Sequence, residues 1–260
     1  MVKCGIKPLT AIILMLVLII NLIQLPNHAS ASSGVDEYDM LRSKIYDVLT
    51  GGDNFDPTDP DISPRISGIE ANGQKYWSTI NNEQNRTYLW SDLSDPLGPN
   101  MDSTHLSGSY SRLAQMAIAY STRGTSLYSN PNLLADIISG MDWMYTNRYT
   151  LSVPVRGYGN WYDWQISSPN SINTVSNLLY SHLTTQQLSD WHAALDRQTL
   201  PLNASNAGAN RVWTCNIMIT SSRSARVKAI LLANHGQFHL HRGHRSPSKN
   251  DFQVCRRSHL

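Results

Sequence analysis

Hydrophobic residues recur at intervals of three and four along most of the chain between residues 36 and 200, which is the spacing of one face of an amphipathic α-helix. The first such segment, residues 36–49, is followed by Gly51-Gly52, a common signal for the end of a helix. The other segments with this spacing are residues 66–80, 87–93, 109–120, 131–145, 169–179 and 184–195. No alternation of polar and apolar residues is long enough to predict a β-strand. Helices joined by short connections predict an all-α fold of stacked helical hairpins, either a bundle or a toroid.

Two of these segments carry clear signals for a helix start. Asn130 stands directly before Pro131, which places an N-cap residue ahead of a proline in the first helical turn. Thr184 and Gln187 have the spacing of a capping box. We therefore expect one helix to begin at Pro131 and another just after Thr184.

The first 31 residues have the pattern of a secretory signal peptide. Lys3 and Lys7 precede an apolar run over residues 12–22, and Ala29-Ser30-Ala31 has the small residues of a cleavage site. The run is too short for a comfortable membrane span. We expect residues 1–31 to be removed, the mature chain to begin near Ser32, and the protein to be extracellular and free of the membrane.

The charge of the chain is divided unevenly. Residues 32–220 contain 11 Lys and Arg against 18 Asp and Glu, whereas residues 221–260 contain 8 against Asp251 alone. This last segment holds five of the nine histidines and none of the Trp or Tyr residues. One interpretation is a basic arm that binds nucleic acid or an anionic surface. The other is that the segment is not native coding sequence. A nucleic-acid arm is the weaker interpretation because the segment lacks interleaved aromatic side chains for base stacking.

Residues 158–164, Tyr-Gly-Asn-Trp-Tyr-Asp-Trp, form the densest aromatic stretch in a chain that is only 8% aromatic. A buried helix would space its aromatic residues three or four apart, so we expect at least one ring to face solvent or a cleft. Flat rings beside amide and carboxylate groups suit a sugar, whose apolar face stacks on the ring. A loop whose rings fold back into the core fits the same residues equally well.

A second candidate stretch is Ala-Gly-Ala-Asn-Arg-Val-Trp at residues 207–213. Small residues ahead of Asn210 would allow close approach of a ligand, and its amide can hold a carboxylate or hydroxyl. A turn with an asparagine cap is the alternative.

Other chemistry is not indicated. The chain has no nucleophile-elbow, zinc-protease, P-loop or dinucleotide-binding motif, and we predict neither a cofactor nor a metal. The acidic loop over residues 53–61 lacks the glycine and terminal glutamate of a calcium-binding EF-hand. His105, His182 and His192 do not have the spacing of metal ligands. The two cysteines that remain after signal cleavage, Cys215 and Cys255, define no disulfide framework.

Several ordered motifs between about residues 37 and 219 resemble the amino-terminal region of polysaccharide lyase family 8, which contains bacterial hyaluronate, chondroitin AC and xanthan lyases. Any one of these motifs is weak, but their order over this span is specific. They are Asp-Met-Leu-Arg at 39–42, Leu-Thr-Gly-Gly at 49–52, Arg-Thr-Tyr-Leu-Trp at 86–90, Ser-Leu-Tyr at 126–128, Asp-Trp-Met-Tyr at 142–145, and the stretches at 159–164 and 208–213.

The resemblance implies an incomplete (α/α) toroid over residues 32–220, which in the family precedes large β-sandwich domains. It implies cleavage of an acidic polysaccharide by β-elimination: an Asn amide neutralises the uronate carboxylate, a base removes the C5 proton and a Tyr protonates the leaving oxygen. Asn210 matches that catalytic Asn. Asn160, Trp161 and Tyr162 match the substrate-binding aromatic patch, which is usually Asn-Trp-Trp in the family. From the same motifs, Trp164 and Arg211 are predicted substrate contacts.

The resemblance ends near Thr220, and the later motif that holds the family's catalytic His and Tyr has no counterpart. A frameshift or truncation after about residue 220 is our hypothesis for residues 221–260, and one of the other reading frames of the coding DNA should then encode a lyase-like segment. The interpretations are a secreted lyase fragment, inactive if base and acid are missing, a non-catalytic carbohydrate-binding module, and a toroidal glycoside hydrolase. The hydrolase is weakest because it needs two carboxylates and Asp163 is the only acid in the aromatic stretch. The choice among hyaluronan, chondroitin and xanthan stays open, as does the oligomeric state.

Overall fold

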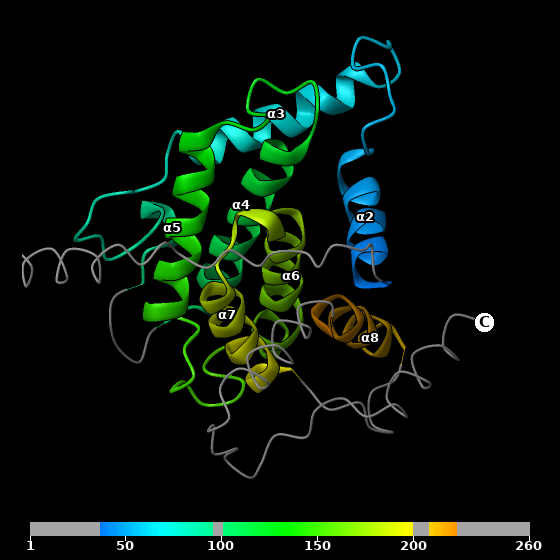
Figure 1. Cartoon of the computed structure of the whole chain (residues 1–260). Coiled ribbons are helices and arrows are strands. Elements are labelled where there is room, and N and C mark those ends of the chain that lie inside the picture. The colour runs from blue at the N-terminus through cyan, green and yellow to red at the C-terminus, as the bar shows by residue number, and fades with distance from the viewer. Residues whose placement is uncertain (1–36, 96–100, 200–207, 223–260) are drawn as a thin grey trace, which may run out of the picture.

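A computed structural model of the chain describes residues 37–95, 101–199 and 208–222, and within these ranges every regular element is helical (Figure 1). The signal peptide and most of the basic segment predicted from the sequence lie outside the described residues. The α-helices are α2 Glu37–Thr50, α3 Ser63–Trp77, α4 Ser103–Ser121, α5 Pro131–Asn147, α6 Ser168–Leu178, α7 Thr185–Gln198 and α8 Ala209–Ser222. Two short 3₁₀ helices, η1 Ser91–Leu93 and η3 Tyr180–His182, and one π-helical turn, η2 Asp163–Ser167, complete the set.

Helix α4 forms the centre of the core. Asp102 caps its start by accepting a hydrogen bond from the Thr104 backbone N–H at 2.9 Å. Twelve of its 19 residues are buried, because small and apolar side chains occupy almost every side. It packs against α3, α5, α6 and η2. At Gly73 of α3 a Cβ would lie 2.4 Å from the Ala119 Cβ, so glycine is what allows α3 to approach α4 this closely.

The other helices surround α4 and α6 as Figure 1 shows. Helix α3 crosses one end, α5 and α7 lie on one side, and α2 and α8 lie on the other. The successive pairs α3–α4, α4–α5 and α6–α7 pack against each other, and every described element is helical, which confirms the prediction of an all-α fold of helical hairpins. In the described part of the chain, no helix is both long enough and apolar enough to cross a membrane.

Local signals in the sequence account for several of these elements. Asn130 caps α5 through its side-chain oxygen, and Thr184 and Gln187 form the predicted capping box at the start of α7. In the acidic loop, Asp56 accepts hydrogen bonds from the backbone and hydroxyl of Thr58, which is a turn role rather than a metal-binding one.

Two predictions about local structure are wrong. The segment 87–93 is extended at Trp90 and helical only over η1, although Leu89 and Trp90 are buried as core residues. The Leu89 carbonyl accepts a hydrogen bond from the Asn81 backbone, which replaces a helical partner. Helix α4 begins at residue 103 rather than 109. Two stretches for which no helix was predicted are also helical: the aromatic stretch from Trp161, and residues 209–222, where a turn was the alternative interpretation.

Candidate functional site: rings and amides between η2 and α8

The aromatic stretch is folded into a tight turn followed directly by a helix. Gly159 has a φ of +68°, and a Cβ at this position would lie 2.5 Å from the Ser103 Oγ. Asn160 then acts as an N-cap, since its Oδ1 accepts a hydrogen bond from the Tyr162 backbone N–H at 3.1 Å. The backbone continues into η2, a π-helical turn of a kind that is frequent at functional sites.

Asp163 anchors this turn to α4. Its carboxylate is buried and accepts hydrogen bonds from the Ser103 and Ser107 hydroxyls at 2.7 and 2.8 Å. The Ser103 Oγ in turn accepts a hydrogen bond from the Asn160 backbone N–H at 2.8 Å. One serine therefore ties both the carboxylate and the start of the helix to α4. Asp163 has a structural role here, so this stretch supplies no exposed carboxylate for a glycosidase mechanism.

Trp164 is part of the core, and its predicted role as a substrate contact is wrong. Its side chain is 0% exposed, and its ring stacks on Tyr149 with the centroids 5.6 Å apart. Its Nε1 donates to the Tyr158 carbonyl at 2.7 Å, and the Tyr149 hydroxyl donates to the Trp164 carbonyl. These hydrogen bonds and the ring stacking fix Trp164 in the core, where it holds the aromatic stretch in place. Its buried ring cannot reach a ligand at the surface.

Tyr158 packs edge-on against Trp164 with its ring centroid 5.1 Å away. Burial raises the pKa of its phenol to about 12, because the phenolate would lose its hydration. The hydroxyl is thus protonated at neutral pH. It is buried without a hydrogen-bond partner among the described residues.

Three rings form a continuous aromatic row from η2 to α8. Trp161 and Tyr162 are half-buried and meet edge to face with their centroids 6.1 Å apart. Tyr162 meets Trp213 of α8 in the same way at 5.5 Å. Trp213 is 39% exposed, so the row ends in a ring that is open to solvent. The two stretches that the sequence singled out separately are therefore in direct contact.

Helix α8 adds polar groups beside this row. Asn210 is exposed and lies one helical turn before Trp213, which puts both residues on the same side of the helix. Asn160 is exposed at the other end of the row. We call Asn160, Trp161, Tyr162, Trp213 and Asn210 the ring-and-amide surface. It carries hydrogen-bonding amides beside flat apolar faces, which is the combination that binds sugars.

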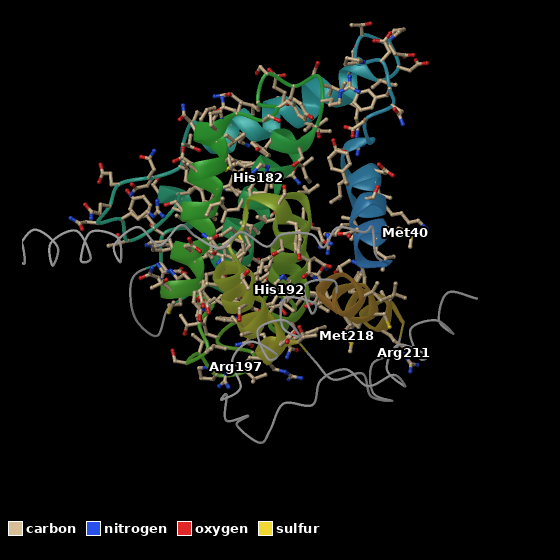
Figure 2. All side chains as sticks on the ribbon, viewed as in Figure 1. Met40, His182, His192, Arg197, Arg211 and Met218 are labelled. Carbon is tan, nitrogen blue, oxygen red and sulfur yellow. The ribbon has the colours of Figure 1, made fainter. Side chains whose placement is uncertain are left out.

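Arg211 is the next residue of α8 after Asn210, and Figure 2 labels it on that helix. Its Nε is buried and has no hydrogen-bond partner within the described ranges. Trp213 is the one residue of the aromatic row that was not predicted from the sequence as a site residue. A helical reading of residues 209–222 would have identified it from its spacing to Asn210.

The described histidines lie elsewhere and have partners of their own. The His105 Nδ1 is 2.8 Å from Asp95, the His182 Nε2 is 3.3 Å from the Tyr120 hydroxyl, and the His192 Nδ1 is 3.2 Å from the Ser221 hydroxyl. Figure 2 shows His182 and His192 well separated. In the part of the chain that the structure describes, no three His, Cys, Asp or Glu side chains form a group that could hold a metal ion.

Known proteins share this arrangement of helices. The model of the polysaccharide lyase family 8 N-terminal α-helical domain matches residues 46–230. The xanthan lyase of Bacillus sp. (strain GL1) is 35% identical over 209 residues, which are 80% of this chain and 21% of that protein. The hyaluronate lyase of Thermasporomyces composti is 30% identical over 187 residues, covering 72% of this chain and 23% of that protein.

Solved structures agree with the sequence matches. Paenibacillus xanthan lyase superposes with a TM-score of 0.68 and 36% identity, over 76% of this chain and 18% of that chain. The chondroitin AC lyase of Streptomyces coelicolor A3, solved in complex with chondroitin sulphate, gives a TM-score of 0.64 and 26% identity over 78% of this chain and 27% of that chain. These likenesses confirm the incomplete (α/α) toroid. The chain spans about a fifth of the length of the curated relatives it matches, and it belongs to polysaccharide lyase family 8, matching the family's N-terminal α-helical domain.

Proposed function

We propose that the chain binds a uronate-containing acidic polysaccharide on the ring-and-amide surface and contributes the carboxylate-neutralising amide for β-elimination. The observation that carries the proposal is the ring contact between Tyr162 and Trp213 at 5.5 Å, because it sets Asn210 beside the aromatic platform. The relatives are xanthan, hyaluronate and chondroitin AC lyases, so a polysaccharide of one of these kinds is the expected substrate.

In this mechanism the sugar rings stack on Trp161, Tyr162 and Trp213, and the Asn210 amide donates hydrogen bonds to the uronate carboxylate. Neutralising the carboxylate lowers the pKa of the C5 proton, since it stabilises the negative charge that develops when the proton leaves. Arg211, the next residue of α8, supplies a second, cationic donor through its guanidinium group. A base then removes the C5 proton, and an acid protonates the departing glycosidic oxygen. We assign neither role to a described residue.

A lyase assay on the full chain tests the proposal. Hyaluronan, chondroitin and xanthan are offered separately, and the readout is the ultraviolet absorbance of the unsaturated uronate that β-elimination creates. If the chain is active, Asn210→Ala should lower kcat by about 10²- to 10³-fold, the usual effect of losing a donor to a developing negative charge. Asn132→Ala, at an exposed asparagine on α5, is the matched control and should leave the rate unchanged.

The second candidate function is carbohydrate binding without catalysis. It is favoured by the groups found on the surface, which are rings, amides and one guanidinium, while Asp163 is buried in hydrogen bonds to serines. Under this alternative the assay shows no absorbance change, yet the chain binds the polysaccharide and Trp161→Ala weakens binding about tenfold or more. Binding that is unaffected by both Trp161→Ala and Asn210→Ala would contradict either version of the proposal.

The same proposal places the protein outside the cell. It is supported by Lys3, Lys7, the apolar run and the small residues at 29–31. Mass spectrometry of the exported chain should show a mature N-terminus near Ser32, and an intact N-terminus at Met1 would contradict this.

A further inference from the structure

A surface hollow of about 290 Å³ lies between the end of α3, η1 and the middle of α4. Its lining combines rings, hydroxyls and charged groups. These are Lys75, Tyr76, Thr79, Trp90, Ser91, Asp92 and Arg112. It is separate from the ring-and-amide surface. Ser103 anchors that surface on α4, and Arg112 follows nine residues later, about 14 Å along the helix. Figure 1 shows α3 and α8 at opposite ends of the molecule.

Arg112 is held rigidly at the base of the hollow. Its guanidinium forms two hydrogen bonds with the Asp92 carboxylate, at 2.8 and 2.5 Å. It also lies over the rings of Tyr76 and Trp90, at 5.2 and 5.3 Å from their centroids. The Trp90 Nε1 donates to the Tyr76 carbonyl at 3.0 Å, which fixes the two rings against each other. The polar groups of the hollow are therefore already in place before a ligand arrives.

Asp92 remains available to a ligand. Its side chain is 64% exposed although it is paired with Arg112. The hydrogen bonds from Arg112 lower the pKa of its carboxyl, so Asp92 is ionised at neutral pH and can accept further hydrogen bonds. A fixed arginine–carboxylate pair beside a ring presents both donors and acceptors, which is what the hydroxyls of a sugar require.

Lys75 gives the hollow its excess positive charge. Its side chain is exposed, and its Nζ lies 5.4 Å from the centroid of the Tyr76 ring. Within the described residues its ammonium forms no ion pair. The exposed side chains of Thr79 and Ser91 add hydroxyl groups at the rim. With two cations against one carboxylate, the hollow favours a ligand that carries a negative charge.

We propose that this hollow is a second saccharide-binding site, which takes one acidic sugar unit of a polysaccharide chain away from the ring-and-amide surface. The sugar carboxylate binds Lys75, its hydroxyls bind Asp92 and Arg112, and its apolar face lies on Tyr76. The size fits, because small-ligand sites in proteins begin at about 300 Å³. The class of ligand rests on the proposed function, but the site itself does not. A polysaccharide held at two points on one chain dissociates more slowly than one held at a single point.

The test is isothermal titration calorimetry of the full chain with short oligosaccharides of hyaluronan, chondroitin sulphate and xanthan, and with a neutral dextran oligosaccharide as the control ligand. We expect two sites per chain for at least one acidic oligosaccharide and none for dextran. Lys75→Glu should weaken one of the two sites about fivefold or more, because it replaces an attraction with a repulsion. Lys44→Glu is the matched control: it reverses the charge of another exposed lysine, on α2, and should leave both sites intact.

Two further variants separate the outcomes. Asp92→Asn should weaken the same site as Lys75→Glu, while circular dichroism shows an unchanged helix content. Trp161→Ala should remove the other site only. If Trp161→Ala abolishes all binding, the hollow is not a site and the proposal fails while the proposed function stands. If Lys75→Glu removes binding and Trp161→Ala does not, the proposed function fails and the second site stands. Equal losses for Lys75→Glu and Lys44→Glu, or no binding by the unmodified chain, would overturn the second site.

Discussion

At the scale of single residues, the ring-and-amide surface depends on Ser103. Its hydroxyl donates to Asp163 and accepts from the Asn160 backbone N–H, so it fixes the turn just before Trp161. Gly159 makes this contact possible in two ways: its backbone has a φ of +68°, and it has no Cβ to collide with the Ser103 Oγ. A side chain here would push away the group that holds both Asn160 and Asp163.

We predict that Gly159→Ala lowers the free energy of unfolding by about 1–3 kcal/mol, because it adds strain in the left-handed region to a collision with Ser103. It should also weaken polysaccharide binding, since Asn160 and Trp161 lose their fixed position. Urea denaturation measures the first effect and calorimetry the second. Gly68→Ala is the control: it lies within α3, nothing is within 4 Å of its Cβ position, and it should raise stability by about 0.5–1 kcal/mol. A Gly159→Ala chain as stable as the unmodified one would contradict this account.

At the scale of elements, the ring-and-amide surface lies where the π-helical turn η2 and the residues before it meet the regular helix α8. The π-helical turn η2 places Asp163 and Trp164 in the core, and the preceding turn leaves Trp161 and Tyr162 half-buried beside α8. Adjacent residues thus take different roles. Trp161 and Tyr162 form the platform, whereas Asp163 and Trp164 hold it in place.

The sequence predicted the elements that depend on local signals, but not the positions that depend on contacts distant in the chain. Long periodic segments and explicit caps, such as Asn130 and the Thr184–Gln187 box, identified α5 and α7 correctly because those signals are local. The burial of Trp164 and Asp163 could not be predicted from the sequence. They depend on Tyr149, Ser103 and Ser107, which are 15 to 60 residues away in the chain.

Helix α8 shows a second limit. The alternative interpretation of this stretch as a turn rested on Gly208 and Asn210, and Gly208 does have a φ of +59° just ahead of the helix. The residues after it carry no cap that sequence rules identify, and the helix is held by packing on α6 and η2. Tertiary contacts of this kind override local propensity. The contact of Trp213 with Tyr162 therefore became visible only in three dimensions.

At the scale of the whole molecule, α2 is the least covered of the α-helices that the structure describes. Of its residues whose exposure the structure describes, 39–50, only Thr50 is buried. Met40 and Val48 are 54% and 82% exposed, and Leu41, Ile45 and Leu49 are only half-buried. Its neighbours among the described elements are α4 and α6. Aliphatic side chains left exposed on one helix favour association.

We therefore predict that the chain self-associates with increasing concentration through α2, and that the double variant Met40→Glu/Val48→Glu shifts it toward the monomer. Withdrawing one exposed aliphatic side chain from a contact loses about 1.5 kcal/mol, so the dissociation constant should rise by about tenfold or more. Sedimentation velocity over a concentration series measures this. Ser43→Glu/Lys44→Gln changes the net charge of the same helix by the same amount without altering an apolar side chain, and it separates charge repulsion from lost apolar contact. If both double variants dissociate equally, repulsion alone is the cause. If the unmodified chain sediments as a monomer at every concentration, the uncovered face of α2 does not drive association.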